Sequence, residues 1–310
     1  MAAFKEDTAP QKVNLAQGAY RTDAGTPFVL ASVKEAERRV AADLRDGRSD
    51  KEYLPIEGHA AFRRLSAELV LGGESPSLRE GRVATLQTLS GTGALSVAAA
   101  ALHRVGGIED IFVPSPSWGN HAPIFTGAGL RVHAYSYLDE RGTGLDFAAM
   151  ARELAALPEG CAVLMHACAH NPTGVDPSVE QWARLAQLFV GRRVLVLFDS
   201  AYQGYASGDL DADAAAVRLF EQAGLLPVVC QSYAKTYPYP YPYPYPYPYP
   251  YPYPTRYAKS MGLYGERVGA VNFVCSHEDE AAALMSQATR RPIRPSAYPP
   301  TLPPTPPLAR

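Results

Sequence analysis

The sequence predicts an α/β protein in which helices cover both faces of a mostly parallel sheet. Short strands alternate with helices along most of the chain, as in a succession of βαβ units. Several strands are apolar throughout, which indicates that both of their faces are buried. Hydrophobic residues make up 47% and charged residues 19% of the 310 residues. This composition supports a large core and excludes a highly charged disordered chain.

The individual elements follow from local patterns. The predicted helices carry apolar residues at helical spacing, and they span 29–45, 60–71, 94–103, 146–157, 179–190 and 212–223. The predicted strands are short and rich in Val, Ile, Leu and Phe, and they span 82–89, 111–114, 131–135, 162–166, 194–198, 225–231 and 268–274.

Polar clusters follow five of the predicted strands. They lie at 90–93, 116–121, 166–174, 199–205 and 232–235. Open α/β sheets bind ligands at the carboxyl ends of their strands. The sequence therefore predicts a site at one edge of the sheet.

Two of these clusters suggest specific chemistry. The segment 90–93 (SGTG) lies between a strand and a helix, where backbone N–H groups can cradle a phosphate, although a tight turn explains it equally well. Ser96 stands where a dinucleotide fingerprint needs its third glycine, so a nicotinamide dehydrogenase has little support. Asp199 closes an apolar strand at the predicted ligand edge; its alternative role is a helix N-cap.

The residue types in a third cluster suggest a metal site. His166, Cys168 and His170 are closely spaced, but Asn171-Pro-Thr-Gly follows at once. We therefore expect a turn that presents Asn171 and no metal site.

Charge and targeting signals narrow the class of protein further. The formal net charge of −2 argues against a basic nucleic-acid binder. The four cysteines show no paired spacing, which favours a reducing compartment. No apolar run approaches the ~20 residues of a membrane span, and residues 1–14 show no targeting peptide. We expect a cytoplasmic protein that binds neither nucleic acid nor membrane.

Two segments have an unusual composition. Of the 28 prolines, nine lie in a Tyr-Pro repeat at 237–254 and eight in the tail 291–310. Proline at every second position excludes a helix or a central strand in the repeat. We expect the repeat to be an extruded excursion and the tail to be disordered.

Eight motifs in chain order resemble the aspartate aminotransferases, pyridoxal-phosphate enzymes of fold type I. They are VNLAQGAYR (13–21), KEYLPIEG (51–58), SGTGAL (90–95), SPSWGNH (115–121), HACAHNPTG (166–174), FDSAYQGYASG (198–208), QSYAK (231–235) and MGLYGERVG (261–269). The resemblance implies a fold type I large domain at 29–290, interrupted at 236–259, and an incomplete small domain. It also implies an arm at 1–28 that contributes to the small domain.

The resemblance assigns roles around the cofactor ring. Asp199 would pair with the pyridinium nitrogen, and His121 would orient that acid. Tyr202 and Asn171 would hydrogen-bond the ring's 3-oxygen and lower the pKa of the imine. Trp118 would stack on the ring.

Further residues match the phosphate cup and the substrate contacts of the family. The implied cup consists of Ser90, Gly91, Thr92, Ser232 and Arg267, with Tyr53 arriving from a second subunit of a homodimer. Gly18, Trp118, Asn171 and Arg294 match substrate-binding positions. Arg294 would grip the side-chain carboxylate of a dicarboxylic substrate.

The lysine that holds the cofactor as a Schiff base has two candidates. Lys235 precedes the Tyr-Pro repeat and Lys259 follows it, each within a Tyr-Ala-Lys triplet. The family's spacing from Asp199 favours Lys235, and its spacing from Arg267 favours Lys259. We prefer Lys235 because a strand leads directly into it.

The implied reaction is the reversible ping-pong transfer of an amino group between L-aspartate and 2-oxoglutarate, with L-glutamate and the 2-oxo acid of aspartate as products. No residue after Pro295 matches the family's arginine for the substrate α-carboxylate, so we expect this chain to be weakly active or inactive. The alternatives are an aromatic aminotransferase of the same fold, or a non-catalytic protein whose proline-rich tracts bind SH3- or WW-type partners.

Overall fold

A computed structural model describes residues 4, 6–9, 11–12, 22–26, 28–49, 51–234, 263 and 265–290. In this part of the chain, seven strands form one sheet in the order β1-β7-β6-β5-β4-β2-β3. The strands are β1 (Val83–Leu89), β2 (Asp110–Ser115), β3 (Arg131–Ser136), β4 (Ala162–His166), β5 (Leu195–Ser200), β6 (Val228–Ser232) and β7 (Val268–Val274). Strand β7 is antiparallel to β1 and β6, and the other neighbouring pairs are parallel.

The strand directions bring distant segments to one edge of the sheet. His166 pairs with Asp199, and Ser200 pairs with Gln231, so β4, β5 and β6 end side by side. Because β7 is antiparallel, its first residue, Val268, lies beside Leu89 at the end of β1. The predicted ligand edge therefore contains the ends of β1, β2, β4, β5 and β6 and the start of β7.

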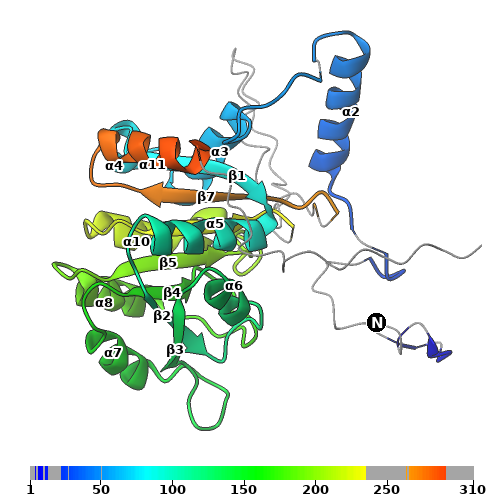
Figure 1. Cartoon of the computed structure of the whole chain (residues 1–310). Helices are drawn as coiled ribbons and strands as arrows, with labels where there is room; N and C mark the ends of the chain where they lie inside the picture. The colour runs from blue at the N-terminus through cyan, green and yellow to red at the C-terminus, as the bar shows by residue number, and fades with distance from the viewer. Residues whose placement is uncertain are drawn as a thin grey trace, which may run out of the picture.

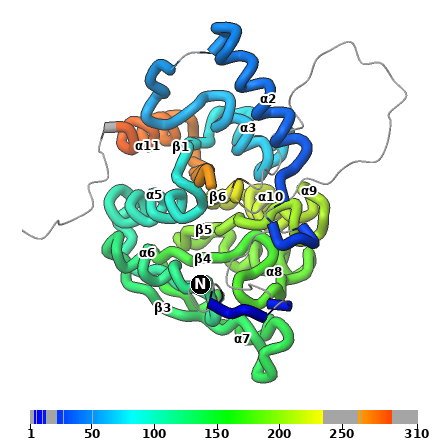
Figure 2. Tube along the Cα trace, turned by 90° about the vertical axis from the view of Figure 1, so that its right-hand side faces the viewer, coloured from blue at the N-terminus to red at the C-terminus, as the bar shows by residue number. Residues whose placement is uncertain are grey.

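Helices cover both faces of the sheet (Figures 1 and 2). Helices α5, α6 and α11 pack on one face, and α3, α7, α8 and α10 pack on the other. The helices are α2 (Ala31–Arg45), α3 (Ala60–Leu71), α4 (Pro76–Arg79), α5 (Ser90–Arg104), α6 (His121–Gly127), α7 (Phe147–Ala155), α8 (Val179–Phe189), α9 (Leu210–Asp213), α10 (Ala215–Gln222) and α11 (Glu278–Arg290).

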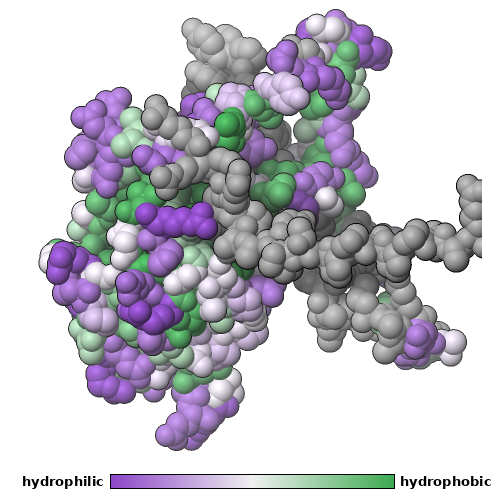
Figure 3. Space-filling view, viewed as in Figure 1, coloured by the Kyte–Doolittle hydropathy of each residue, from purple (hydrophilic) through white to green (hydrophobic). Residues whose placement is uncertain are grey.

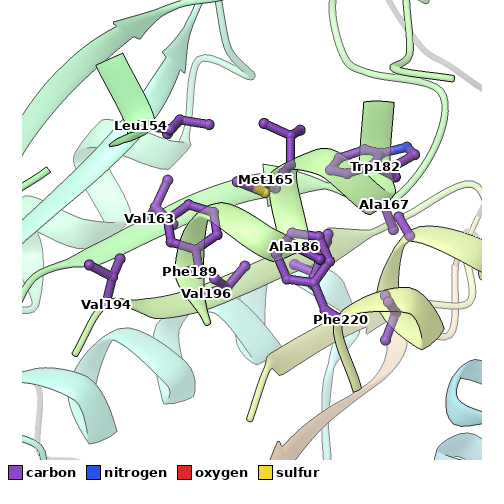
Figure 4. Packing of buried hydrophobic residues seen from close by; sticks show 14 of the residues in the cluster. Leu154, Val163, Met165, Ala167, Trp182, Ala186, Phe189, Val194, Val196 and Phe220 are labelled. Carbon is purple, nitrogen blue, oxygen red and sulfur yellow. The ribbon is translucent and has the colours of Figure 1, made fainter. Parts of the chain in front are cut away.

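The core lies between the sheet and these helices. Figure 4 shows Val163 and Met165 of β4 packed against Trp182 and Phe189 of α8, with Phe220 of α10 beside them. These side chains are nearly or fully buried, and burying each one contributes about 1.5–3 kcal/mol. The apolar strands that the sequence predicts thus form the sheet side of this core.

Local signals explain where several helices begin. At α8, the Ser178 side chain accepts from the Gln181 N–H, while the Gln181 side chain accepts from the Ser178 N–H. This reciprocal pair is a capping box. At α7, the Asp146 side chain accepts from the Ala149 N–H, so this helix starts one residue later than the sequence predicts.

The fold class expected from the sequence is confirmed, and several boundaries need correction. Helix α5 begins at Ser90, so the glycine segment forms its first turn rather than a loop before it. The helix expected at 212–223 is divided into α9 and α10 at Ala214. Three helices were not predicted: α4, α6 and α11.

Helix α2 stands to one side of the sheet (Figure 1), and its only buried residue is Val33. Its surface in Figure 3 mixes hydrophilic and hydrophobic residues, and Val40 and Leu44 are exposed. None of the helices in the described ranges is long and apolar enough to cross a membrane.

Candidate functional site

A cavity opens at the edge where β1, β4, β5 and β6 end. Its lining comes from six segments that are far apart in the sequence. The lining residues are Ser90, Gly91, Thr92, Leu95, Trp118, His166, Cys168, Asn171, Asp199, Ala201, Tyr202, Ser232, Ala234 and Arg267. The structure thus brings together nine residues that the sequence singled out.

One side of the cavity is a cup of hydroxyls and backbone amides at the N-terminus of α5. Ser90 Oγ and Ser232 Oγ lie 3.2 Å apart, although 142 positions separate them in the chain. A Cβ built on Gly91 would lie 3.0 Å from the Ser232 Cβ, so this glycine leaves the space between them open. The helix N-terminus adds unpaired N–H groups and a positive partial charge. Such a cup suits a phosphate.

Close backbone approach holds the cup together. A Cβ on Gly269 would lie 2.4 Å from the Ser90 carbonyl carbon and 2.7 Å from the Gln231 carbonyl oxygen. Only glycine fits here, because both neighbours are main-chain atoms. Gly269 was not among the predicted residues, although it lies in the motif that supplied Arg267.

Residues with strained backbone conformations lie around the cavity. Among the described residues, the non-glycine positions with positive φ are Ser90 (61°), Ala169 (47°) and Arg267 (54°). Ser90 and Arg267 line the cavity, and Ala169 lies in the loop that presents Asn171. Such conformations are unfavourable for L-residues, and they cluster at functional sites.

The opposite side of the cavity holds an acid and its hydrogen-bond relay. His121 Nε2 lies 3.0 Å from Asp199 Oδ2, and Ser117 Oγ lies 2.8 Å from His121 Nδ1. His121 is 1% exposed and Asp199 is 9% exposed. An ionised carboxylate can only accept, so His121 donates to Asp199 through Nε2. The expected pairing of His121 with Asp199 is present in this geometry.

His166 extends the relay and was not predicted as a site residue. Its Nδ1 accepts from the Asn171 N–H at 3.1 Å, and its Nε2 lies 3.5 Å from Ser117 Oγ. Burial lowers the pKa of His166 to about 3, so the ring is neutral at pH 7. Its position as the last residue of a buried strand was the available signal.

The remaining predicted ring contacts also reach the cavity. Trp118, Asn171 and Tyr202 line it from the segments after β2, β4 and β5. The Trp118 ring meets the His121 ring edge-on, with centroids 5.2 Å apart. The indole therefore lies beside the acid relay, packed against the core cluster that contains Leu95 and Phe125.

Other predicted residues lie elsewhere. Tyr53 is 96% exposed and does not line the cavity. Lys235, Lys259, Gly18 and Arg294 lie outside the described residues, as do the Tyr-Pro repeat and the tail.

A second hollow, between α7 and α8, is lined mainly by apolar side chains and Arg184. None of the predicted site residues lies there. The chemistry therefore concentrates at the sheet edge.

The fold and the cavity place a cup suited to an anionic group at a helix N-terminus, close to a buried carboxylate. The chain belongs to the class I and II aminotransferase family, whose model matches residues 10–240.

Individual relatives support this membership. The chain is 47% identical over 285 residues to the cytoplasmic isozyme 2 of aspartate aminotransferase from Arabidopsis thaliana, covering 92% of this chain and 64% of the relative. It is 48% identical over 286 residues to mitochondrial aspartate aminotransferase of Xenopus tropicalis, covering 92% and 60%. The chain thus spans less than two thirds of these relatives.

A solved structure shows the same architecture. The aromatic-amino-acid aminotransferase of Burkholderia pseudomallei, covalently bound to pyridoxal phosphate, is 38% identical to this chain. It matches with a TM-score of 0.80 over 93% of this chain and 65% of its own.

Proposed function

We propose that this protein binds pyridoxal phosphate and acts as an aspartate aminotransferase. The reaction would transfer an amino group reversibly between L-aspartate and 2-oxoglutarate. The observation that carries the proposal is the convergence of an anion cup, a buried acid and an indole in one cavity. The two curated relatives with 47% and 48% identity are named aspartate aminotransferases, which favours aspartate as the substrate.

The donor set of the cavity fits the cofactor. Ser90, Ser232 and the α5 N-terminus would hold the phosphate, and Arg267 would add a guanidinium fork that matches phosphate oxygens. The open space beside Gly91 admits an oxygen next to the Ser232 hydroxyl.

The ring end of the cavity fits equally well. Asp199 is held by His121 through one oxygen and would stabilise a protonated pyridine nitrogen. Trp118 would stack on the ring, and Asn171 and Tyr202 would hydrogen-bond its 3-oxygen. When bound, pyridoxal phosphate supplies an electron sink for the bond broken at the substrate Cα.

The residues of the chain would perform three tasks in the reaction. A lysine Nζ would hold the cofactor covalently and then move a proton at the substrate Cα. Asp199, hydrogen-bonded to His121, would pair with the pyridine nitrogen. Trp118 would shield the reacting atoms from water on one side.

We favour Lys235 over Lys259 for the covalent attachment. Ala234, the residue before Lys235, lines the cavity and follows the Ser232 hydroxyl by two positions. Because consecutive Cα atoms are about 3.8 Å apart, the residue that follows Ala234 is our choice for the attachment.

A homodimer is part of the proposal. Tyr53, Leu54 and Ile56 are 96%, 56% and 76% exposed on a segment that forms neither helix nor strand. Neighbouring exposed apolar residues of this kind are typical of an interface. In a dimer, Tyr53 would reach the phosphate of the second subunit. We propose a cytoplasmic location, as for the Arabidopsis relative; the Xenopus relative is mitochondrial.

The test begins with cofactor binding by the purified full chain. Pyridoxal phosphate is added, the protein is dialysed, and its absorbance is recorded before and after borohydride reduction. We expect a retained band that borohydride removes, and a cofactor remnant on Lys235 in peptide mapping. A remnant on Lys259 would reverse our choice of lysine. Absence of any covalent remnant contradicts the cofactor proposal.

Turnover distinguishes the two substrate classes. We expect a higher kcat/KM for L-aspartate than for L-phenylalanine with 2-oxoglutarate as acceptor. The reverse preference would favour the aromatic activity named for the Burkholderia pseudomallei structure. The variant Gly265→Ala is measured in the same assays as a control for the effect of a substitution, since nothing lies within 4 Å of its added Cβ.

A further inference from the structure

In each of two loops of the cavity wall, backbone N–H groups donate to the carboxylate of one aspartate that lies farther along the chain. The loop after β5 carries Tyr202, and the loop after β4 carries Asn171. Asp213, the last residue of α9, contacts the first loop, and Asp176 lies in the second. Neither aspartate lines the cavity, so neither is part of the site described above.

Asp213 gathers three backbone N–H groups of the loop after β5. Its carboxylate accepts from Gly204 at 2.7 Å, from Ala206 at 3.0 Å and from Ser207 at 3.1 Å. The residue is 5% exposed. Hydrogen bonds to an ionised acceptor are about twice as strong as neutral ones. The single buried carboxylate of Asp213 therefore closes the loop through backbone donors that lie two to five residues beyond Tyr202.

A second anchor fixes the same loop from the other side. Gln203 Nε2 donates to the Leu69 carbonyl at 2.9 Å and to the Leu210 carbonyl at 3.0 Å. Gln203 is 2% exposed. Tyr202, the residue before Gln203, thus lies on a short segment that these hydrogen bonds fix to α3 and α9. They restrain the backbone from which the Tyr202 side chain projects.

Asp176 performs the equivalent task in the loop after β4. Its carboxylate accepts from the Ala169 N–H at 2.5 Å and from the His170 N–H at 2.8 Å. Ala169 has a φ of +47°, which an alanine rarely adopts. Successive N–H groups in such a conformation form a concavity that binds an anion. The carboxylate therefore stabilises the strained residue two positions before Asn171.

We propose that Asp213 and Asp176 are positioning residues that hold Tyr202 and Asn171 at the cofactor's 3-oxygen. The hydrogen bonds within this chain are sufficient to support the claim that the two aspartates restrain the two loops. The link to the 3-oxygen rests on the proposed function. The test therefore has one arm without cofactor and one with it.

The first arm measures amide hydrogen exchange in the full chain without cofactor. In Asp213→Asn, the amides of 204–207 are expected to exchange at least about tenfold faster, since an amide group cannot accept from three donors without turning its own NH₂ toward them. In Asp176→Asn, the amides of 169–170 should respond in the same way. Asp211→Asn is the matched control, because Asp211 is exposed and contacts Arg218 instead. Amides of α8 report whether each variant is folded.

The second arm measures the pH midpoint of the absorbance change of bound pyridoxal phosphate. Losing the Tyr202 hydrogen bond should raise this midpoint by about one pH unit in Asp213→Asn. The other titratable groups of the cavity wall, His166, Cys168, Asp199 and Arg267, are unchanged in the variant. A purely structural role would leave the midpoint at the wild-type value.

The outcomes separate the two claims. Unchanged loop exchange in folded variants overturns the positioning role. Faster exchange with an unshifted midpoint overturns the connection to Tyr202. A wild-type chain that takes up no cofactor contradicts the proposed function, while the exchange arm still decides whether the aspartates hold the loops. If Asp213→Asn does not fold, Asp176→Asn decides the question.

Discussion

The two ends of the cavity are built in different ways. At the phosphate end, main-chain atoms meet directly: Gly269 touches the backbone of Ser90 and Gln231, and Ser90 adopts a positive φ. At the acid end, side chains form a relay from Asp199 through His121 and Ser117 to His166. A backbone-built cup tolerates no added atom, whereas a relay of side chains can be weakened one hydrogen bond at a time.

The largest effect should come from filling the backbone contact. Gly269→Ala places a Cβ 2.4 Å from the Ser90 carbonyl carbon, so either β7 or the first turn of α5 must shift. We expect the free energy of unfolding to fall by about 3 kcal/mol and the cofactor to be lost on dialysis. Urea unfolding and absorbance measure these two effects.

Gly265→Ala is the control for this variant, because its Cβ would meet nothing within 4 Å. It should change the free energy of unfolding by less than about 0.5 kcal/mol. Equal stability of the two alanine variants would contradict the account of the cup.

An intermediate effect concerns the acid end and depends on pH. The pKa of His166 is about 3 in the folded protein because of burial, and about 6.5 in an unfolded chain. Between these values the unfolded chain binds more protons, so stability is full above pH 6.5 and declines as the pH falls toward 3. At pH 5 this histidine alone should cost about 2 kcal/mol.

The variant His166→Asn isolates this contribution. Its amide oxygen can accept from the Asn171 N–H in place of Nδ1. Between pH 7 and pH 5, the variant should lose about 2 kcal/mol less unfolding free energy than the wild type. His170, whose pKa burial lowers to about 4, is present in both proteins and cancels. Identical pH profiles would count against a neutral His166.

The smallest effect should come from one hydroxyl of the cup. Ser232→Ala removes the partner of Ser90 Oγ and one donor to the phosphate. We expect about tenfold weaker cofactor binding, measured by titration with pyridoxal phosphate. Ser96→Ala removes an exposed serine of the same helix α5 and should bind like the wild type. An effect of Ser232→Ala as large as that of Gly269→Ala would remove the distinction between backbone and side-chain contributions.

The sequence predicted those parts of the site that follow from strand ends. Asp199 and Ser232 lie at the ends of β5 and β6, Ser90 directly follows β1, and Asn171 follows β4 by five residues, so the sheet brings them to one edge. Apolar periodicity locates such strands. Because parallel strands run in the same direction, their carboxyl ends lie at one edge of the sheet. The motifs that resemble the family then supplied Trp118, Tyr202 and Arg267, which periodicity alone does not single out.

Other features depend on tertiary contacts that leave no local pattern. His166 looked like part of a turn, and its burial beside His121 gives it a place in the relay. Asp176 and Asp213 resemble ordinary loop and helix acids until their backbone donors are known. Helix α6 is seven residues long and contains Pro123, which conceals it from a search for helical periodicity.

The central claim is that Asp199 and the cup act on the same bound molecule. The most direct measurement is NMR of pyridoxal phosphate labelled with ¹⁵N in the ring, bound to the wild type and to Asp199→Asn. We predict a protonated ring nitrogen in the wild type, an unprotonated one in the variant, and an unchanged ³¹P signal in both. A ring nitrogen with the same shift in the two proteins would contradict the account.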